Sequence, residues 1–149
     1  MRIISIVAIL VLCACTSSTA PEKKDKTELD PKLAVEFANR YVEYVDDRKK
    51  TIGRIEWLNS QSILSSDFKS ALNEFYKSRE FVGFDPILDA QDYPDQGFEV
   101  DSVDSNYVIV KGVDWEEFRV TLKLIEINGE WHIDGSGVIN VPPNRRIKR

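Results

Sequence analysis

The sequence has few of the residues that build metal centres, disulfide frameworks or nucleophilic active sites. Its 149 residues contain one His, two Cys and one Met. A structural zinc site takes four ligands, mostly Cys and His, and a Cys–His nucleophile needs both residue types in the folded domain. We therefore predict a non-catalytic protein with no cofactor and no metal site.

Positive charge is also scarce. The chain has 20 Lys and Arg against 25 Asp and Glu, which gives a formal net charge of −5. General nucleic-acid binders depend on positive charge that neutralises phosphates. We therefore expect no nucleic-acid partner.

Residues 1–14 have the features of a signal peptide. Arg2 precedes an apolar run from Ile3 to Leu12, and this run is about half the roughly 20 residues that a membrane-spanning helix needs. It ends in Leu-Cys-Ala-Cys, which resembles the bacterial lipobox and implies that Cys15 becomes the acylated first residue of the mature chain. Several acyl chains on one residue give stable membrane anchoring. The alternative is ordinary secretion with cleavage after Ala20.

Residues 15–29 are polar and show no apolar periodicity, which predicts a flexible tether. Thr16 stands where an Asp would resemble an inner-membrane retention signal. We therefore expect a periplasmic protein at the inner leaflet of the outer membrane.

Three helices are predicted next. Asp30-Pro31 is typical of a helix start, and apolar residues at three- and four-residue spacing extend the first helix to about Asp46. A shorter helix is predicted over residues 52–58. A third begins after a Ser cap at Ser65 or Ser66, and its apolar stripe comprises Phe68, Ala71, Leu72, Phe75 and Tyr76.

After Gly83 the pattern alternates, as in antiparallel strands. Strands are predicted over residues 98–104, 107–111, 117–127 and 130–141, with tight turns at 105–106 and at Asn128-Gly129. With a two-residue turn at Asn128-Gly129, the residue numbers of two paired residues on these strands add up to 257. This register puts Leu124 opposite Ile133 and Lys123 opposite Asp134. It places the following side chains on the solvent face: Arg119, Thr121, Lys123, His132 and Asp134.

Helices followed by about four antiparallel strands predict an α+β domain over residues 30–141. The order resembles the NTF2-like (cystatin-like) cone, in which a long first helix lies against a curved sheet. Residues 142–149 form a basic tail that we expect to be disordered or extended.

Several segments carry a closer resemblance: EFANRYVEYV, WLNSQSILSSDFKSALNEFY, FDPILDAQDYPD and GEWHID. Over residues 33–140 they resemble a family of bacterial secreted lipoproteins of unknown function, related to YbjP-type envelope lipoproteins. The resemblance implies a fold and a location, and it implies no chemistry.

Residues 80–110 contain eight acids and no Lys or Arg. These acids are Glu80, Asp85, Asp89, Asp92, Asp95, Glu99, Asp101 and Asp104. One hypothesis is a loop that steers a basic partner protein, and its candidate residues are Asp85, Asp89, Gln91, Asp92, Tyr93, Asp95 and the turn residue Trp115. The alternatives are calcium binding and a structural loop, in which Asp85 and Asp92 accept loop amides and Tyr93 packs inward.

His132 and Asp134 share a strand face, which would suit a proton-transfer dyad, but Lys123 competes for the carboxylate.

Taken together, these features predict a monomeric, membrane-anchored protein that binds another envelope protein. Two alternatives are binding or turnover of a small molecule between the first helix and the sheet, and immunity against an envelope-directed toxin.

Overall fold

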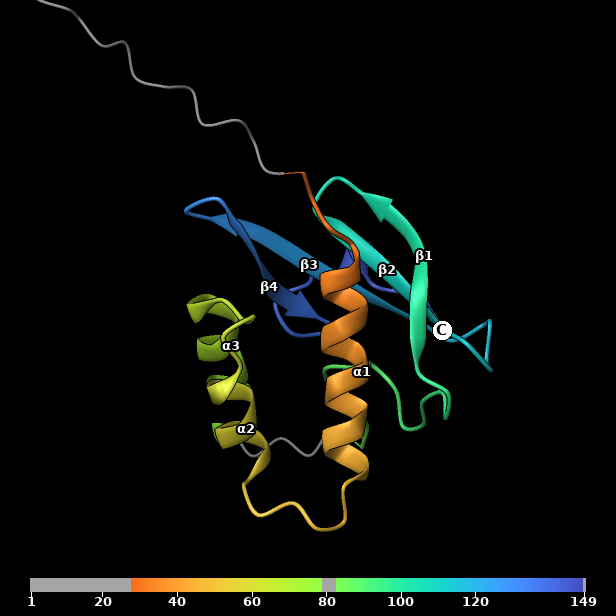
Figure 1. Ribbon diagram of the computed structural model, residues 1–149. Coiled ribbons are helices and arrows are strands. Elements are labelled where there is room, and N and C mark those ends of the chain that lie inside the picture. Colours follow the sequence, from red (N-terminus) through yellow and green to blue (C-terminus); the bar gives the residue numbers. More distant parts are fainter. Residues whose placement is uncertain (1–27, 79–82, 149) are drawn as a thin grey trace, which may run out of the picture.

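The computed structural model describes residues 28–78 and 83–148 (Figure 1). Three helices come first: α1 (Lys32–Asp46), α2 (Arg54–Ser60) and α3 (Ser66–Lys77). The strands are β1 (Phe98–Asp104), β2 (Tyr107–Gly112), β3 (Arg119–Ile127) and β4 (Glu130–Ser136), followed by a 3₁₀ turn, Pro143–Arg145. They form one antiparallel sheet in the order β1-β2-β3-β4. The predicted α+β class is confirmed.

The predicted signal peptide, the predicted lipidation site Cys15 and almost all of the predicted tether lie outside the described residues. Within the described ranges, each helix is too short or too polar to span a bilayer.

The helix starts follow the capping signals in the sequence. The Asp30 carboxylate accepts a hydrogen bond from the Lys32 amide at 2.9 Å, and the Ser65 hydroxyl accepts one from the Phe68 amide at 3.0 Å. Side-chain oxygens at these positions satisfy amides that have no partner within the helix. The second helix was predicted to begin at residue 52 but begins after Gly53, which has an extended backbone that ends the preceding loop.

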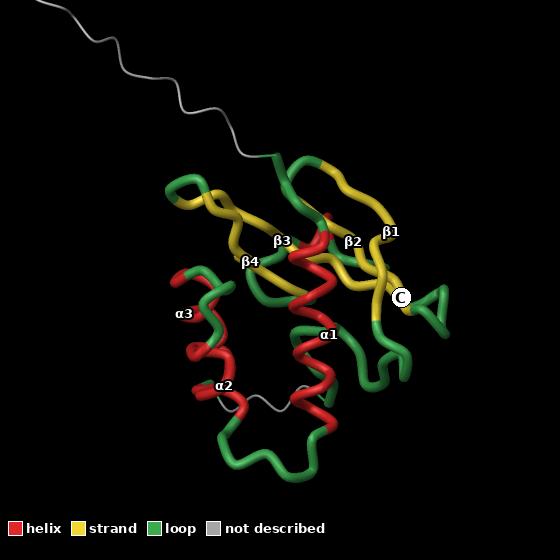
Figure 2. The backbone as a smooth tube through the Cα atoms, viewed as in Figure 1, coloured by secondary structure: helices red, strands yellow, loops and turns green. Residues whose placement is uncertain are grey.

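The hydrophobic core lies between the helices and one face of the sheet (Figures 1 and 2). α1 packs on β1, β2 and β4, and α3 packs on β4 and α2. The largest side chains in this space are at most 1% exposed, and they include Phe37, Tyr41, Phe68, Leu122, Leu124 and Ile133. The space in which a pocket-forming domain would keep its cavity is therefore filled with side chains.

Counted from the Asn128-Gly129 turn, the predicted β3–β4 register is confirmed as far as the Leu124–Ile133 pair and is wrong for the residues beyond that pair. Leu124 pairs with Ile133 as expected, but a bulge then pairs Lys123 with Gly135. The unpaired Asp134 is only 4% exposed, although we predicted it on the solvent face. It is buried because the chain before α3 covers the free edge of β4, where the Ser65 amide donates to the Ile133 carbonyl at 2.9 Å.

The C-terminal segment is packed rather than disordered. The Thr121 hydroxyl donates to the Arg145 carbonyl at 2.8 Å, so Thr121 is buried under this segment and not in solvent as predicted. The Arg145 guanidinium pairs with Asp104 and lies 4.9 Å from the Tyr107 ring centre. β4 ends at Ser136, earlier than predicted, because Gly137 turns the chain with a positive φ of 57°.

Candidate functional site

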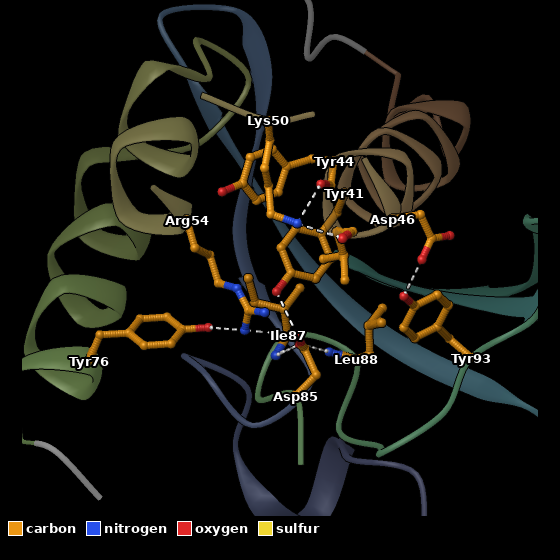
Figure 3. A network of polar contacts seen from close by, with 11 residues as sticks. Tyr41, Tyr44, Asp46, Lys50, Arg54, Tyr76, Asp85, Ile87, Leu88 and Tyr93 are labelled. Atoms are coloured by element: carbon orange, nitrogen blue, oxygen red, sulfur yellow. Dashed lines mark hydrogen bonds and ion pairs between the residues drawn. The ribbon is translucent and has the colours of Figure 1, made fainter. Parts of the chain in front are cut away.

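Asp85, the first residue of the predicted partner loop, points into the protein (Figure 3). One carboxylate oxygen accepts the amides of Ile87 and Leu88 at 2.9 and 3.1 Å. The other accepts the Tyr41 hydroxyl at 2.7 Å and an Arg54 guanidinium N–H at 3.2 Å. The side chain is 11% exposed. Asp85 therefore holds its loop onto α1 and α2 and is not part of the exposed surface.

The tyrosines around this loop are held in their protonated form. Burial, together with the neighbouring Asp85 carboxylate, raises the pKa of Tyr41 well above its usual range. Tyr93 donates to Asp46 at 2.6 Å, which ties the loop to the last residue of α1. Partial burial and this hydrogen bond raise the pKa of Tyr93 to about 12. The inward packing of Tyr93 agrees with the structural alternative for the loop.

Residues 80–110 carry only negative charges in the sequence, but in the folded protein several of these acids lie beside Lys or Arg from other segments. Glu99 pairs with Lys111 at 3.1 Å, and Asp101 pairs with Arg119 at 3.1 Å. Asp104 pairs with Arg145 from the C-terminal segment. These partners neutralise the acids on β1, which leaves the loop before β1 as the more strongly negative region. Glu80 lies outside the described residues.

Four of the predicted residues meet at one groove of about 450 Å³: Asp89, Gln91, Asp92 and Trp115. Four further residues complete the groove and were not predicted from the sequence: Phe84, Ala90, Glu117 and Phe118. The segment GVDWEEF contains a signal for Glu117, because its acids flank the exposed Trp. Phe84 and Phe118 carried no such signal, since buried and groove-lining Phe look alike in a sequence.

The segments next to the two sides of this groove, residues 95–97 and 113–114, are joined by hydrogen bonds. The Asp114 carboxylate accepts the Asp95 amide at 3.3 Å and the Gln96 amide at 3.1 Å. The Val113 amide donates to the Gly97 carbonyl at 3.0 Å. Asp95, one of the predicted site residues, does not line the groove, and its amide is bonded to Asp114. These bonds fix the turn that carries Trp115 against the segment that leads into β1.

Close packing at Gly112 also holds these two segments together. A Cβ at Gly112 would lie 2.4 Å from the Pro94 side chain and 2.7 Å from the Trp115 carbonyl. Only glycine permits this approach, because real Cβ atoms do not come so near to backbone oxygens. Gly112 therefore packs directly against both Pro94 and the backbone of the turn that carries Trp115.

The other wall rests on the end of β4 and on the chain that follows it. The Ser136 hydroxyl donates to the Ile87 carbonyl at 2.8 Å, and the Val138 amide donates to the Pro86 carbonyl at 2.9 Å. Together with Asp85, these bonds fix the loop from residue 84 to residue 92. A groove that is already rigid loses little conformational entropy when it binds.

The lining of the groove combines aromatic surface with negative charge. Trp115 is 43% exposed, and its ring centre lies 5.2 Å from that of Phe118, which is 3% exposed. The charged residues among those that line the groove are Asp89, Asp92 and Glu117, and no Lys or Arg is among them. In the described ranges, no three Asp, Glu, His or Cys side chains converge as metal ligands would. The groove chemistry suits a basic protein surface.

The His132–Asp134 pair does not form the proposed dyad. Asp134 accepts the Ser65 hydroxyl at 2.6 Å and pairs with Lys123 at 2.7 Å, so both of its oxygens are engaged. The His132 ring nitrogen Nδ1 lies 3.2 Å from the Glu130 carbonyl. Asp134 therefore joins the start of α3 to the sheet.

Comparison with known proteins gives no family. No protein-family model and no curated protein matches this chain. The structure of the type VI native effector–immunity complex Tae3–Tai3 from Ralstonia pickettii contains a chain with a TM-score of 0.48 and 16% identity. That match covers 71% of this chain and 91% of the other. A protein of unknown function from Bacteroides thetaiotaomicron has a TM-score of 0.43 and 16% identity, over 71% of this chain and 89% of the other. Likeness at this level does not bear on function.

Proposed function

We propose that this chain is a lipid-anchored, periplasm-facing envelope protein with a non-catalytic domain that binds a basic surface of another protein. Lipidation at Cys15 rests on the lipobox-like sequence at the end of the signal peptide. Binding rests on the groove between residues 84–92 and 115–118. The observation that carries it is the exposed Trp115 ring, set beside carboxylates in a groove that the fold holds rigid.

Such a site agrees with how protein interfaces obtain affinity. A few central aromatic residues supply most of the binding energy, and complementary charge raises the rate of association. Trp115 has an aromatic support in Phe118, and three carboxylates line the same groove, those of Asp89, Asp92 and Glu117. The site would bind a basic protein through one aromatic anchor within a negatively charged rim.

The alternative of a small-molecule pocket has less support. The space between α1 and the sheet is filled by buried side chains. Tyr44 on α1 packs against α2, because it stacks on Trp57 with a ring distance of 4.7 Å, and it donates to the Ile52 carbonyl at 2.9 Å. We therefore place the binding site at the groove.

The test uses a photo-crosslinking amino acid at position 115 in the native host. The matched control carries the same amino acid at Val103 on β1, which is 47% exposed against 43% for Trp115. We expect a protein to be captured at position 115 and not at position 103. An envelope-directed toxin as the captured protein would support the immunity alternative, and a resident envelope protein would support an assembly role.

The captured protein is then purified and titrated against the wild type, Trp115→Ala and Val103→Ala. We expect at least a tenfold loss of affinity for Trp115→Ala and less than a twofold change for Val103→Ala, because truncating an interface anchor costs about 2 kcal/mol or more. Equal affinity of both variants would reject the groove as the site.

A further inference from the structure

We propose that the groove recognises an arginine of the partner, with its guanidinium stacked on Trp115 and paired with Asp92 and Glu117. This inference rests on the proposed function and names the chemical group that the groove takes. It starts from the combination of exposed indole and carboxylates along a single groove of about 450 Å³.

The charge and shape of the site favour an extended organic cation. The carboxylates come from two separate walls, one before β1 and one between β2 and β3. Among the described residues they do not converge with a third acid as the ligands of a metal ion would. A planar cation on a long side chain can instead reach both walls while its apolar stem contacts Phe84 and Ala90.

Arginine fits this arrangement better than lysine does. Its guanidinium is planar, stacks on aromatic faces and donates two parallel hydrogen bonds to a carboxylate. A lysine ammonium is more strongly hydrated and has no flat face for the indole. Trp is the aromatic residue that attracts cations most strongly. The rigid support of Trp115 by Phe118 keeps the ring in a defined orientation for stacking.

The basic C-terminal segment of a second copy is a poor occupant. Arg145 pairs with Asp104 of its own chain. Arg146 donates to the carbonyls of Val141 and Val138 at 2.8 and 3.0 Å. These contacts hold both arginines against their own segment, so they are not available for the groove of a second copy.

The experiment titrates the full chain, purified in a zwitterionic detergent, with two blocked tripeptides, Gly-Arg-Gly and Gly-Lys-Gly. NMR follows the three tryptophan indole N–H signals, and the Trp115→Phe variant assigns the signal of Trp115. We expect the arginine peptide to shift the Trp115 signal and to leave those of Trp57 and Trp131 in place. We expect at least threefold weaker binding of the lysine peptide.

The variant Asp92→Asn/Glu117→Gln should weaken binding of the arginine peptide at least threefold. The matched control is Glu43→Gln/Glu74→Gln, which removes the same charge from exposed sites on α1 and α3 and should leave binding unchanged. No shift at Trp115, equal binding of both peptides, or equal loss in both variants would overturn the arginine assignment.

The outcomes separate this inference from the proposed function. If the captured protein loses affinity for Trp115→Ala while the arginine peptide leaves Trp115 unchanged, the groove binds protein without an arginine anchor. If the peptide binds Trp115 while Trp115→Ala leaves affinity for the captured protein unchanged, the arginine site exists and the proposed function fails.

Discussion

The carboxylates of the loops around the groove fall into two groups with opposite surroundings. Asp85 has four hydrogen-bond donors and is nearly buried. Asp92 and Glu117 are exposed, and no ion pair among the described residues includes them. The first group holds the loop in place, whereas the second adds negative charge that folding does not use. The difference separates residues that build the groove from residues available for binding.

The strongest challenge to this comparison is Asp85→Ala. The substitution removes four hydrogen bonds and leaves the Tyr41 hydroxyl and two loop amides without their acceptor. We expect the free energy of unfolding, measured in urea, to fall by about 3 kcal/mol. Asp92→Ala is the control and should change it by less than about 0.5 kcal/mol. Equal effects of the two substitutions on the free energy of unfolding would contradict the distinction between acids that stabilise the loop and acids that do not.

Ser65→Ala tests the other inward-facing carboxylate. Ser65 caps α3 and also donates to the buried Asp134, so its loss affects two contacts. We expect unfolding to become easier by about 2 kcal/mol, at the upper end for a helix cap. The neighbouring Ser66 is exposed, and Ser66→Ala should cost less than about 0.5 kcal/mol. If the two substitutions cost the same, the Ser65–Asp134 contact does not stabilise the fold.

A smaller effect is expected at Tyr93, whose hydrogen bond to Asp46 is another contact that holds the loop in place. The ordinary pKa of tyrosine is 10.0, and in the folded protein that of Tyr93 is raised to about 12. A raised folded pKa contributes stability that is present below pH 10 and is lost as the pH rises through 12. NMR titration of labelled tyrosine should show this midpoint in the wild type. It should fall toward the ordinary value in Asp46→Asn, and an unchanged midpoint would contradict the role of Asp46.

Local features of the fold could be predicted because neighbouring residues determine them. The Ser65 cap, the start of α1 and the turn at Asn128-Gly129 each depend on a few adjacent residues. Gly135 and Gly137 in the last strand predict a bend or bulge there, but the burial of Asp134 at the bulge could not be predicted, because its partner Ser65 lies far away in the sequence. The packing of the C-terminal segment likewise depends on Asp104 and Thr121, which become its partners only in the folded sheet.

At the candidate site, too, contacts between residues that are far apart in the sequence could not be predicted. The sequence singled out Asp89, Gln91, Asp92 and Trp115, and the structure places all four along one groove. It could not distinguish them from Asp85, since an acid in a loop looks the same whether it faces solvent or a buried tyrosine. It also could not show that residues 84–92 and 115–118 meet, because that contact depends on the β-sheet and on Gly112.

The central claim is that the exposed acids of the groove serve binding and not folding. The most direct test is the affinity of the protein captured at Trp115 for Asp92→Asn/Glu117→Gln, with Glu43→Gln/Glu74→Gln as the charge-matched control. We predict at least a tenfold loss of affinity for the groove variant, less than a twofold loss for the control, and an unfolding free energy within about 0.5 kcal/mol of wild type for both. Equal affinity losses in the two variants, or a groove variant that unfolds more easily but binds normally, would contradict the claim.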